Sequence, residues 1–321
     1  MRNQVVGHSR VEALDDAAPA GRSAQQAPES WTRRELLRGG AVILLGVSGA
    51  ELLAACSGAA TASPTPVAAT PTPSPRIPEI SLTATDTTFD APGTLSAGLV
   101  QVSLENNGSL TSSMNVLRVR EGKTFDEVKA NFPKPDSQLA SLSLVFESFG
   151  GCTGLPAGQR CSVVLDLAAG TYALLSRASG QSAGIVKQVV VSQASGATAP
   201  EPAADVTVSL KDGVGPAVPA TVKAATRWKV TNDGQVPHAF QIWRFKSGKS
   251  AADLLSYFAN PGSGPVPAEV VAGSGVLSPG KRAWFTSELA PAEYLDACTV
   301  TGRNPPATHM NEGEIAKIIV G

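Results

Sequence analysis

The chain has 321 residues, of which 26 are basic and 27 are acidic, so its formal net charge is −1 at pH 7. This even balance argues against a polybasic protein, and we expect no nucleic-acid partner. Hydrophobic residues make up 42% of the chain, which is enough to form a packed core. The 4 Cys and 3 His residues are too few for an oxidase with a multinuclear copper centre.

An export signal is predicted near the start of the chain. The pair Arg33-Arg34 precedes a short apolar run, Ala41–Val47, and this order resembles a twin-arginine signal. The run is far shorter than the ~20 apolar residues of a spanning helix. Leu53–Cys56 then resembles a bacterial lipobox, although an uncleaved anchor with an incidental Cys is the alternative. We expect residues 1–55 to be removed, Cys56 to carry lipid, and the protein to be anchored on the extracytoplasmic face of the cell membrane.

Two segments of low complexity separate the remaining parts of the chain. Residues 56–76 are mostly Ala, Ser, Thr and Pro, a composition that cannot bury a core and predicts an extended tether. Residues 195–204 have a similar composition and predict a linker. The folded material is therefore expected at 77–194 and at 205–321.

Short alternating or β-branched runs between turn residues predict strands in both segments. In 77–194 the predicted strands are Ile80–Ala84, Val100–Leu104, Asn115–Val119, Ser162–Leu167, Tyr172–Leu175 and Val186–Val191. In 205–321 they are Val206–Leu210, Arg227–Val230, Phe240–Phe245, Ala283–Ser287, Tyr294–Cys298 and Ile315–Val320. Capping-box patterns that begin at Thr124 and Ser250 predict one short helix in each segment. An antiparallel β-sandwich is the fold expected of each segment.

The two segments also repeat each other in sequence. Residues 106–132 align on 232–258 without a gap, at an offset of 126, and residues 155–176 align on 277–298 at an offset of 122. The matched positions include Asn106 with Asn232 and Tyr172 with Tyr294. A period this long excludes a solenoid or a propeller blade and indicates a duplicated domain.

Motifs of the second segment resemble those of the cupredoxins, the blue-copper family. In order they are Asn232-x-Gly234 with His238, the turn Leu277–Gly280, Tyr294-x-x-x-Cys298, and His309 followed by Gly313. The resemblance implies an all-β chain with two tandem cupredoxin-like Greek-key β-sandwiches, each with one short inserted helix.

The resemblance also implies a metal site in the second segment. Cupredoxins bind copper through two His and one Cys with a weak axial ligand, and the positions here are His238, Cys298 and His309. Glu314 stands where the family has its axial Met. In the first segment Ser112 aligns with His238, so we expect one copper ion at most, in residues 205–321.

Two features of the second segment depart from the family pattern. Ten residues separate Cys298 from His309, more than is usual in cupredoxins. A carboxylate at Glu314 favours Cu(II) and a low potential, and Met310 is in the wrong place to replace it. The alternative is that His238 and His309 are structural and that Cys298 is a small buried side chain.

Cys152 and Cys161 form a second feature, because a turn between them can bring two strand ends together. In an extracytoplasmic compartment a disulfide is their expected state. The alternative is that the two thiols stay reduced because they lie too far apart to pair. The spacing of the two cysteines is only a weak indication of a zinc site.

No catalytic motif is present in the sequence, so we do not expect an enzyme. The first expected function is a surface module that binds an unidentified protein or small ligand. The alternative is a copper protein for electron transfer or copper delivery.

Overall fold

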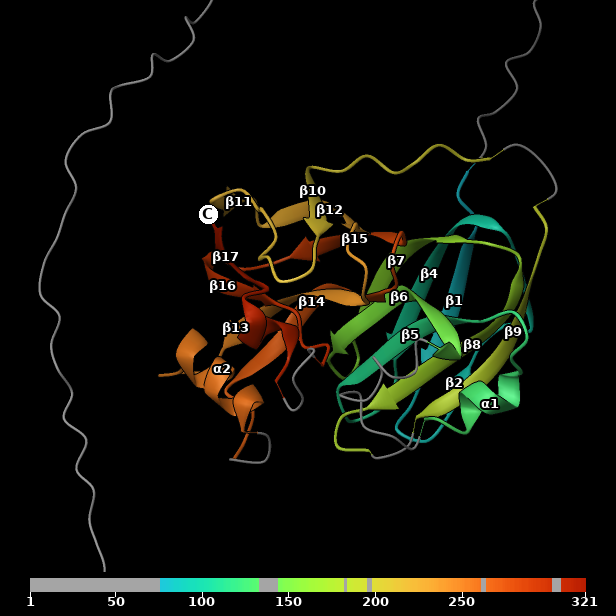
Figure 1. The fold of residues 1–321 in the computed structure, drawn as a ribbon, viewed down its shortest axis with the longest axis horizontal. Coiled ribbons are helices and arrows are strands. Elements are labelled where there is room, and N and C mark those ends of the chain that lie inside the picture. The colour runs from blue at the N-terminus through green and yellow to red at the C-terminus, as the bar shows by residue number, and fades with distance from the viewer. Residues whose placement is uncertain (1–75, 133–143, 182–183, 195–197, 261–263, 302–306) are drawn as a thin grey trace, which may run out of the picture. The chain divides into compact units, whose positions relative to one another are not determined.

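The computed structural model describes residues 76–132, 144–181, 184–194, 198–260, 264–301 and 307–321 (Figure 1). The first half contains β1 (Glu79–Ala84), β2 (Phe89–Asp90), β3 (Thr94–Ser96), β4 (Gly98–Asn106), β5 (Ser112–Val119), α1 (Phe125–Lys129), β6 (Phe146–Leu155), β7 (Arg160–Leu167), β8 (Gly170–Ala178) and β9 (Ile185–Ser192). The second half contains β10 (Val206–Leu210), β11 (Thr221–Val222), β12 (Ala225–Asn232), β13 (His238–Phe245), α2 (Ala251–Ala259), β14 (Ala268–Leu277), β15 (Arg282–Glu288), β16 (Ala292–Ala297), the 3₁₀ turn η2 (His309–Glu312) and β17 (Ile315–Val320). The prediction of an all-β sandwich with a short helix in each half is confirmed.

The strands form two sheets, and both sheets run through the two halves of the chain. The smaller sheet has the order β10-β12-β15-β7-β4-β1-β2, and the larger has the order β11-β17-β16-β13-β14-β6-β5-β8-β9-β3. Each order mirrors itself about the junction of the halves, except that β2 at the end of the smaller sheet has no counterpart there. In the smaller sheet β10, β12 and β15 correspond to β1, β4 and β7. The halves therefore join edge to edge, through β15 with β7 and β14 with β6.

The strand registers repeat between the halves as well. Glu79 pairs with Gln101 where β1 runs parallel to β4, and Val206 pairs with Trp228 where β10 runs parallel to β12. In both pairs the partners are the same distance apart in the chain. The same local sequence thus produces the same strand pairing twice.

Side-chain hydrogen bonds repeat in the same way. Asn106 donates through Nδ2 to the carbonyl of Leu155, and Asn232 donates to the carbonyl of Leu277, at 2.9 and 2.7 Å. The hydroxyls of the two aligned tyrosines also bond to the backbone four residues earlier, Tyr172 to Ala168 and Tyr294 to Ala290. Such a bond fixes the corner before a strand of a sandwich.

The sequence analysis missed the short strands β2, β3 and β11, and also β6 and β14, the pair that joins the halves in the larger sheet. Both contain glycines in place of an alternating pattern, with Gly150, Gly151 and Gly275 at positive φ. At Gly151 and Gly275 a side chain would collide with neighbouring backbone. Glycine permits this close approach of neighbouring backbones. Because it has no side chain, it also interrupts the hydrophobic periodicity by which a strand is predicted from the sequence.

The core lies between the two sheets and takes side chains from both halves. Leu104 and Leu165 are fully buried in it, beside Trp228, Phe240 and Phe285. The Trp228 and Phe285 rings stack with centroids 6.2 Å apart. The Trp228 Nε1–H donates to the Ser287 hydroxyl at 2.9 Å, so the hydrogen-bond donor of this buried indole has a partner.

Each helix covers a smaller cluster on a strand face that does not line this core. Val128 of α1 packs with Leu117 and its neighbours, and Leu254 of α2 packs with Trp243 and Met310. Both predicted capping boxes are present, at Thr124 and at Ser250. Neither helix in the described ranges is long and apolar enough to cross a membrane.

The predicted signal sequence, the lipidated Cys56 and almost all of the predicted tether lie outside the described residues. The part of the predicted linker that is described, residues 198–204, contains no strand or helix.

Candidate metal centre

Four side chains from separate segments of the second half converge at one end of the sheets. His238 is the first residue of β13, Cys298 directly follows β16, His309 begins η2, and Glu314 stands just before β17. Gly313 closes η2 with φ 105°, a conformation that glycine adopts without strain. This turn directs Glu314 back toward the two imidazoles.

The ligand-type atoms of these residues all lie within 4.8 Å of one another. His238 Nδ1 is 3.2 Å from His309 Nδ1, and His309 Nδ1 is 3.5 Å from Cys298 Sγ. Glu314 Oε2 is 2.7 Å from His238 Nδ1 and 3.1 Å from His309 Nδ1. We call these four residues the His-Cys-His-Glu cluster. Among the residues that the structure describes, it is the one group of three or more His, Cys, Asp or Glu with this arrangement.

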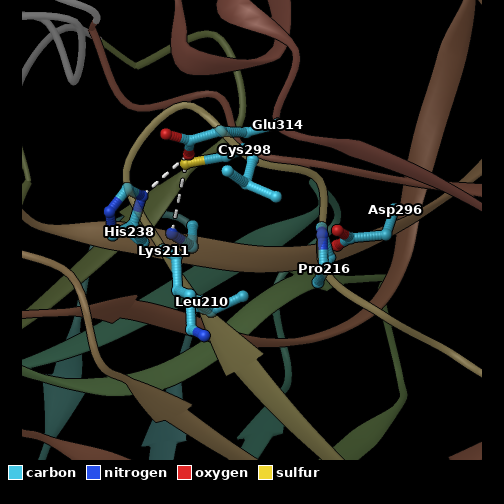
Figure 2. A pocket seen from close by; sticks show the side chains of 9 residues that line it. Leu210, Lys211, Pro216, His238, Asp296, Cys298 and Glu314 are labelled. Atoms are coloured by element: carbon cyan, nitrogen blue, oxygen red, sulfur yellow. Dashed lines mark hydrogen bonds and ion pairs between the residues drawn. The ribbon is translucent and has the colours of Figure 1, made fainter.

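All four side chains of the cluster are buried, with at most 4% of any residue exposed. His238, Cys298 and Glu314 line part of a cavity of about 10 Å³, close to the space that one water needs. Figure 2 shows His238, Cys298 and Glu314 pointing toward one another, with the carboxylate of Asp296 set apart from them on the neighbouring strand. The segment after β10 closes the cavity with Lys211, Val214 and Pro216.

A second layer of hydrogen bonds holds the cluster in place. Asp212 Oδ1 lies 2.8 Å from His238 Nε2, on the side of the ring away from the cluster. The backbone N–H of Gly213 donates to Glu314 Oε1 at 2.8 Å, and that of Ala239 donates to Cys298 Sγ at 3.3 Å. Such partners fix the orientation of a ligand and the tautomer of a histidine.

The carboxylates determine the protonation of His238. Burial by itself lowers the pKa of His238, but hydrogen bonds to Glu314 and Asp212 outweigh it and hold the pKa above 6.5. Burial raises the pKa of Glu314, yet the hydrogen bonds from His238, His309 and Gly213 lower it to about 2. Burial raises the pKa of the Cys298 thiol well above 9.0. Below pH 6.5, therefore, the metal-free protein holds an imidazolium between two carboxylates and beside a neutral thiol.

The donor set fits a metal ion with four ligands. Metal–nitrogen and metal–oxygen bonds of about 2.0–2.2 Å and a metal–sulfur bond of about 2.3 Å separate tetrahedral ligands by roughly 3.3–3.6 Å. The observed spacings of 3.1–3.5 Å around His309 Nδ1 lie close to this range. His238 Nδ1 and Glu314 Oε2 lie 2.7 Å apart, and an ion held by both atoms would displace the proton between them.

The structure brings together every residue that the sequence suggested for the metal site. Glu314 points into the cluster, whereas Met310 is buried beneath α2 with Trp243. The long segment after Cys298 is accommodated because its ends pair with each other. Thr301 forms a bridge with Thr308, and the His309 N–H donates to the carbonyl of Val300 at 2.9 Å.

Asp212 is the functional residue that the sequence analysis missed. Its counterpart in the first half is Asp86, which accepts hydrogen bonds from the backbone of Ser109 and Leu110. Asp212 accepts one in the same way from Gln235 and also contacts His238. The offset of 126 between the two aspartates matches the repeat, and this match is the signal that could have identified the position.

The first half has serines at the positions equivalent to His238 and Cys298. The hydroxyls of Ser112 and Ser176 lie 3.5 Å apart and are buried. Cys152 of β6 and Cys161 of β7 form a disulfide, with their Cα atoms 6.3 Å apart. Cys298 is a free thiol.

No family model matches the chain, and no curated protein matches it. Solved structures that it resembles include auracyanin B, at 18% identity over 38% of this chain and 93% of that chain, with a TM-score of 0.27. Auracyanin A, a blue copper protein from Chloroflexus aurantiacus, is 18% identical over 36% of this chain and 98% of that one, with a TM-score of 0.25. A copper-containing nitrite reductase from Thermus scotoductus is 10% identical over 77% of this chain and 62% of that chain, with a TM-score of 0.23. These neighbours are cupredoxins, the family that the motifs of the second half resemble.

Proposed function

We propose that this protein binds one copper ion at the His-Cys-His-Glu cluster and carries electrons through it. The observation that supports this most directly is the convergence of two imidazoles, a thiolate-forming Cys and a carboxylate within 4.8 Å in a buried site. A thiolate with two imidazoles is the donor set of mononuclear copper electron-transfer sites. Bound there, copper would supply a one-electron redox centre.

Each residue of the cluster has a separate role in this proposal. His238 and His309 offer Nδ1 to the ion, and Asp212 keeps the proton on Nε2 of His238. Cys298 would hold the ion as a thiolate, and the Ala239 N–H that donates to its sulfur would stabilise that charge. Glu314 supplies a fourth, anionic ligand that stabilises Cu(II) over Cu(I) and lowers the reduction potential.

The closed coordination favours electron transfer over catalysis. Catalytic metal sites keep one position open for water or substrate. Here four protein side chains would hold the ion, and Lys211, Val214 and Pro216 cover the cavity beside them. We therefore propose a protein without enzymatic activity of its own.

Titration of the full chain with Cu(II) tests the copper site. We expect one equivalent to bind and to produce an intense visible band from thiolate-to-copper charge transfer. Cys298→Ser should abolish the band, whereas Ser176→Ala, at the equivalent position of the first half, should leave it intact. A titration without such a band, or a band that survives in Cys298→Ser, would refute the proposal.

A second measurement separates electron transfer from copper delivery. For electron transfer, the bound ion should be reduced and reoxidised reversibly and should stay on the protein in the presence of a competing chelator. Rapid loss to the chelator would instead show that the site hands its copper on. Glu314→Met should raise the reduction potential, because it replaces an anionic ligand with a neutral soft one.

We also propose that the protein works outside the cytoplasm, held to the membrane by lipid on Cys56. The support is the order of the arginine pair, the apolar run and the lipobox in the sequence. Expression in a host with the twin-arginine pathway should yield a membrane-bound form whose first residue is a lipid-modified Cys56. Cys56→Ser should release it, and mass spectrometry of the mature N-terminus decides the question.

A further inference from the structure

A groove of about 740 Å³ lies where the two halves of the chain join. Its floor takes residues from β5 and β6 of the first half and from β13 and β14 of the second, four strands that are neighbours in the larger sheet. Tyr257 and Phe258 of α2 and residues 179–181 after β8 also line the groove. Figure 1 shows α2 beside β13 and β14, with β5, β6 and β8 following across the sheet. The volume is in the range of small-molecule sites.

Two uncharged, buried hydrogen-bond donors in the lining of this groove have no partner among the residues that the structure describes. They are the indole Nε1 of Trp243 and the hydroxyl Oγ1 of Thr153. Trp243 is only 6% exposed. A buried donor without a partner carries a desolvation cost, so a ligand that accepts hydrogen bonds at this point would recover that cost.

The charge and the aromatic content of the lining define the chemistry of such a ligand. The ionisable side chains are three cations and one carboxylate, namely Arg177, Arg244, Lys246 and Glu269. Arg244 and Glu269 form an ion pair with each other, which leaves the remaining field positive. The Trp243 and Phe258 rings meet edge to face at 5.9 Å, and both residues line the groove. The lining therefore combines aromatic side chains with positive charge and unpaired donors.

We propose that this groove binds a small planar aromatic carboxylate. Its ring would lie against Trp243 and Phe258, and its carboxylate would accept from Trp243 Nε1–H and the Thr153 hydroxyl in the field of Arg177 and Lys246. The groove is a separate site from the His-Cys-His-Glu cluster. Binding is therefore measured on the metal-free protein, and its outcome is independent of the copper proposal.

Isothermal titration of the metal-free full chain with 2-naphthoate tests this site, with 2-naphthamide as an uncharged ligand of the same shape. We expect one naphthoate per chain with a Kd below about 1 mM, since the ligand is small. The amide should bind at least about tenfold more weakly, because hydrogen bonds to a charged acceptor are the stronger ones.

Thr153→Val removes one donor without changing the side-chain shape and should weaken naphthoate binding about tenfold. Trp243→Phe should weaken it to a similar extent. Trp284→Phe is the matched control, because the Nε1 of Trp284 is also buried without a partner but lies outside the groove lining, and it should leave Kd unchanged. Circular dichroism verifies that each variant is folded. Equal affinities for acid and amide, an unchanged Kd in folded Thr153→Val, or no saturable binding would each overturn the proposal.

Discussion

Replacing Glu314 with glutamine tests how the metal-free cluster is held together. The substitution keeps the shape of the side chain but removes its negative charge, which leaves the buried imidazolium of His238 without its partner at 2.7 Å. The pKa of Glu314 is lowered from 4.5 to about 2, which corresponds to about 3 kcal/mol of stability from this group when the carboxyl is ionised. Glu314→Gln should therefore lower the free energy of unfolding by about 3 kcal/mol.

The pH dependence of this loss separates a charge effect from a packing effect. Because the pKa of Glu314 is lower in the folded state, its contribution is fully present above pH 4.5 and is lost as the pH falls toward 2. The difference between the parent protein and Glu314→Gln should shrink from about 3 kcal/mol near pH 5.5 to roughly 1 kcal/mol near pH 3. In the parent protein the raised pKa of His238 keeps its imidazole protonated below pH 6.5.

Urea unfolding of the full chain in the presence of a chelator measures both values. Glu293→Gln is the control, because Glu293 pairs with Lys317 on the surface, where both side chains are 57% exposed. Such a pair contributes at most about 1 kcal/mol. If Glu314→Gln were as stable as the parent protein, or if its deficit were the same at both pH values, the charge-pair reasoning would be refuted.

Three further predictions concern the repeat, the second layer of the site and the disulfide. Asn232→Ala should destabilise the protein by about 2–4 kcal/mol in urea unfolding, because it leaves the carbonyls of Val236 and Leu277 without their donor; a loss below about 1 kcal/mol would contradict this. Asp212→Asn should weaken copper binding about 10- to 100-fold in a chelator competition while the visible band persists, since it disturbs only the orientation of His238; an unchanged affinity would show that the contact is incidental. Reduction of Cys152–Cys161 should cost about 2–3 kcal/mol of stability for a loop of this length, and a reduced protein with an unchanged urea midpoint would count against it.

Local signals in the sequence predicted most of the strands and both helix starts. Alternation over Val206–Leu210 reflects burial on one sheet face, and the capping boxes at Thr124 and Ser250 require only neighbouring residues. These features depend on a few consecutive positions, so the sequence alone reveals them. The internal repeat then allowed each prediction in one half to be checked against the other.

The sequence by itself also named the four residues of the His-Cys-His-Glu cluster, because the motif order and the scarcity of histidine left few candidates. It did not determine whether they meet. That depends on how η2 and the turn at Gly313 return the chain to β13 after ten intervening residues. Only the tertiary structure shows that the halves join through the glycine-rich strands β6 and β14. The same holds for the groove that lies at this junction. The physical reason is the same in each case: these contacts join segments far apart in the chain, and glycine, which allows the closest backbone approach, leaves no hydrophobic pattern to read.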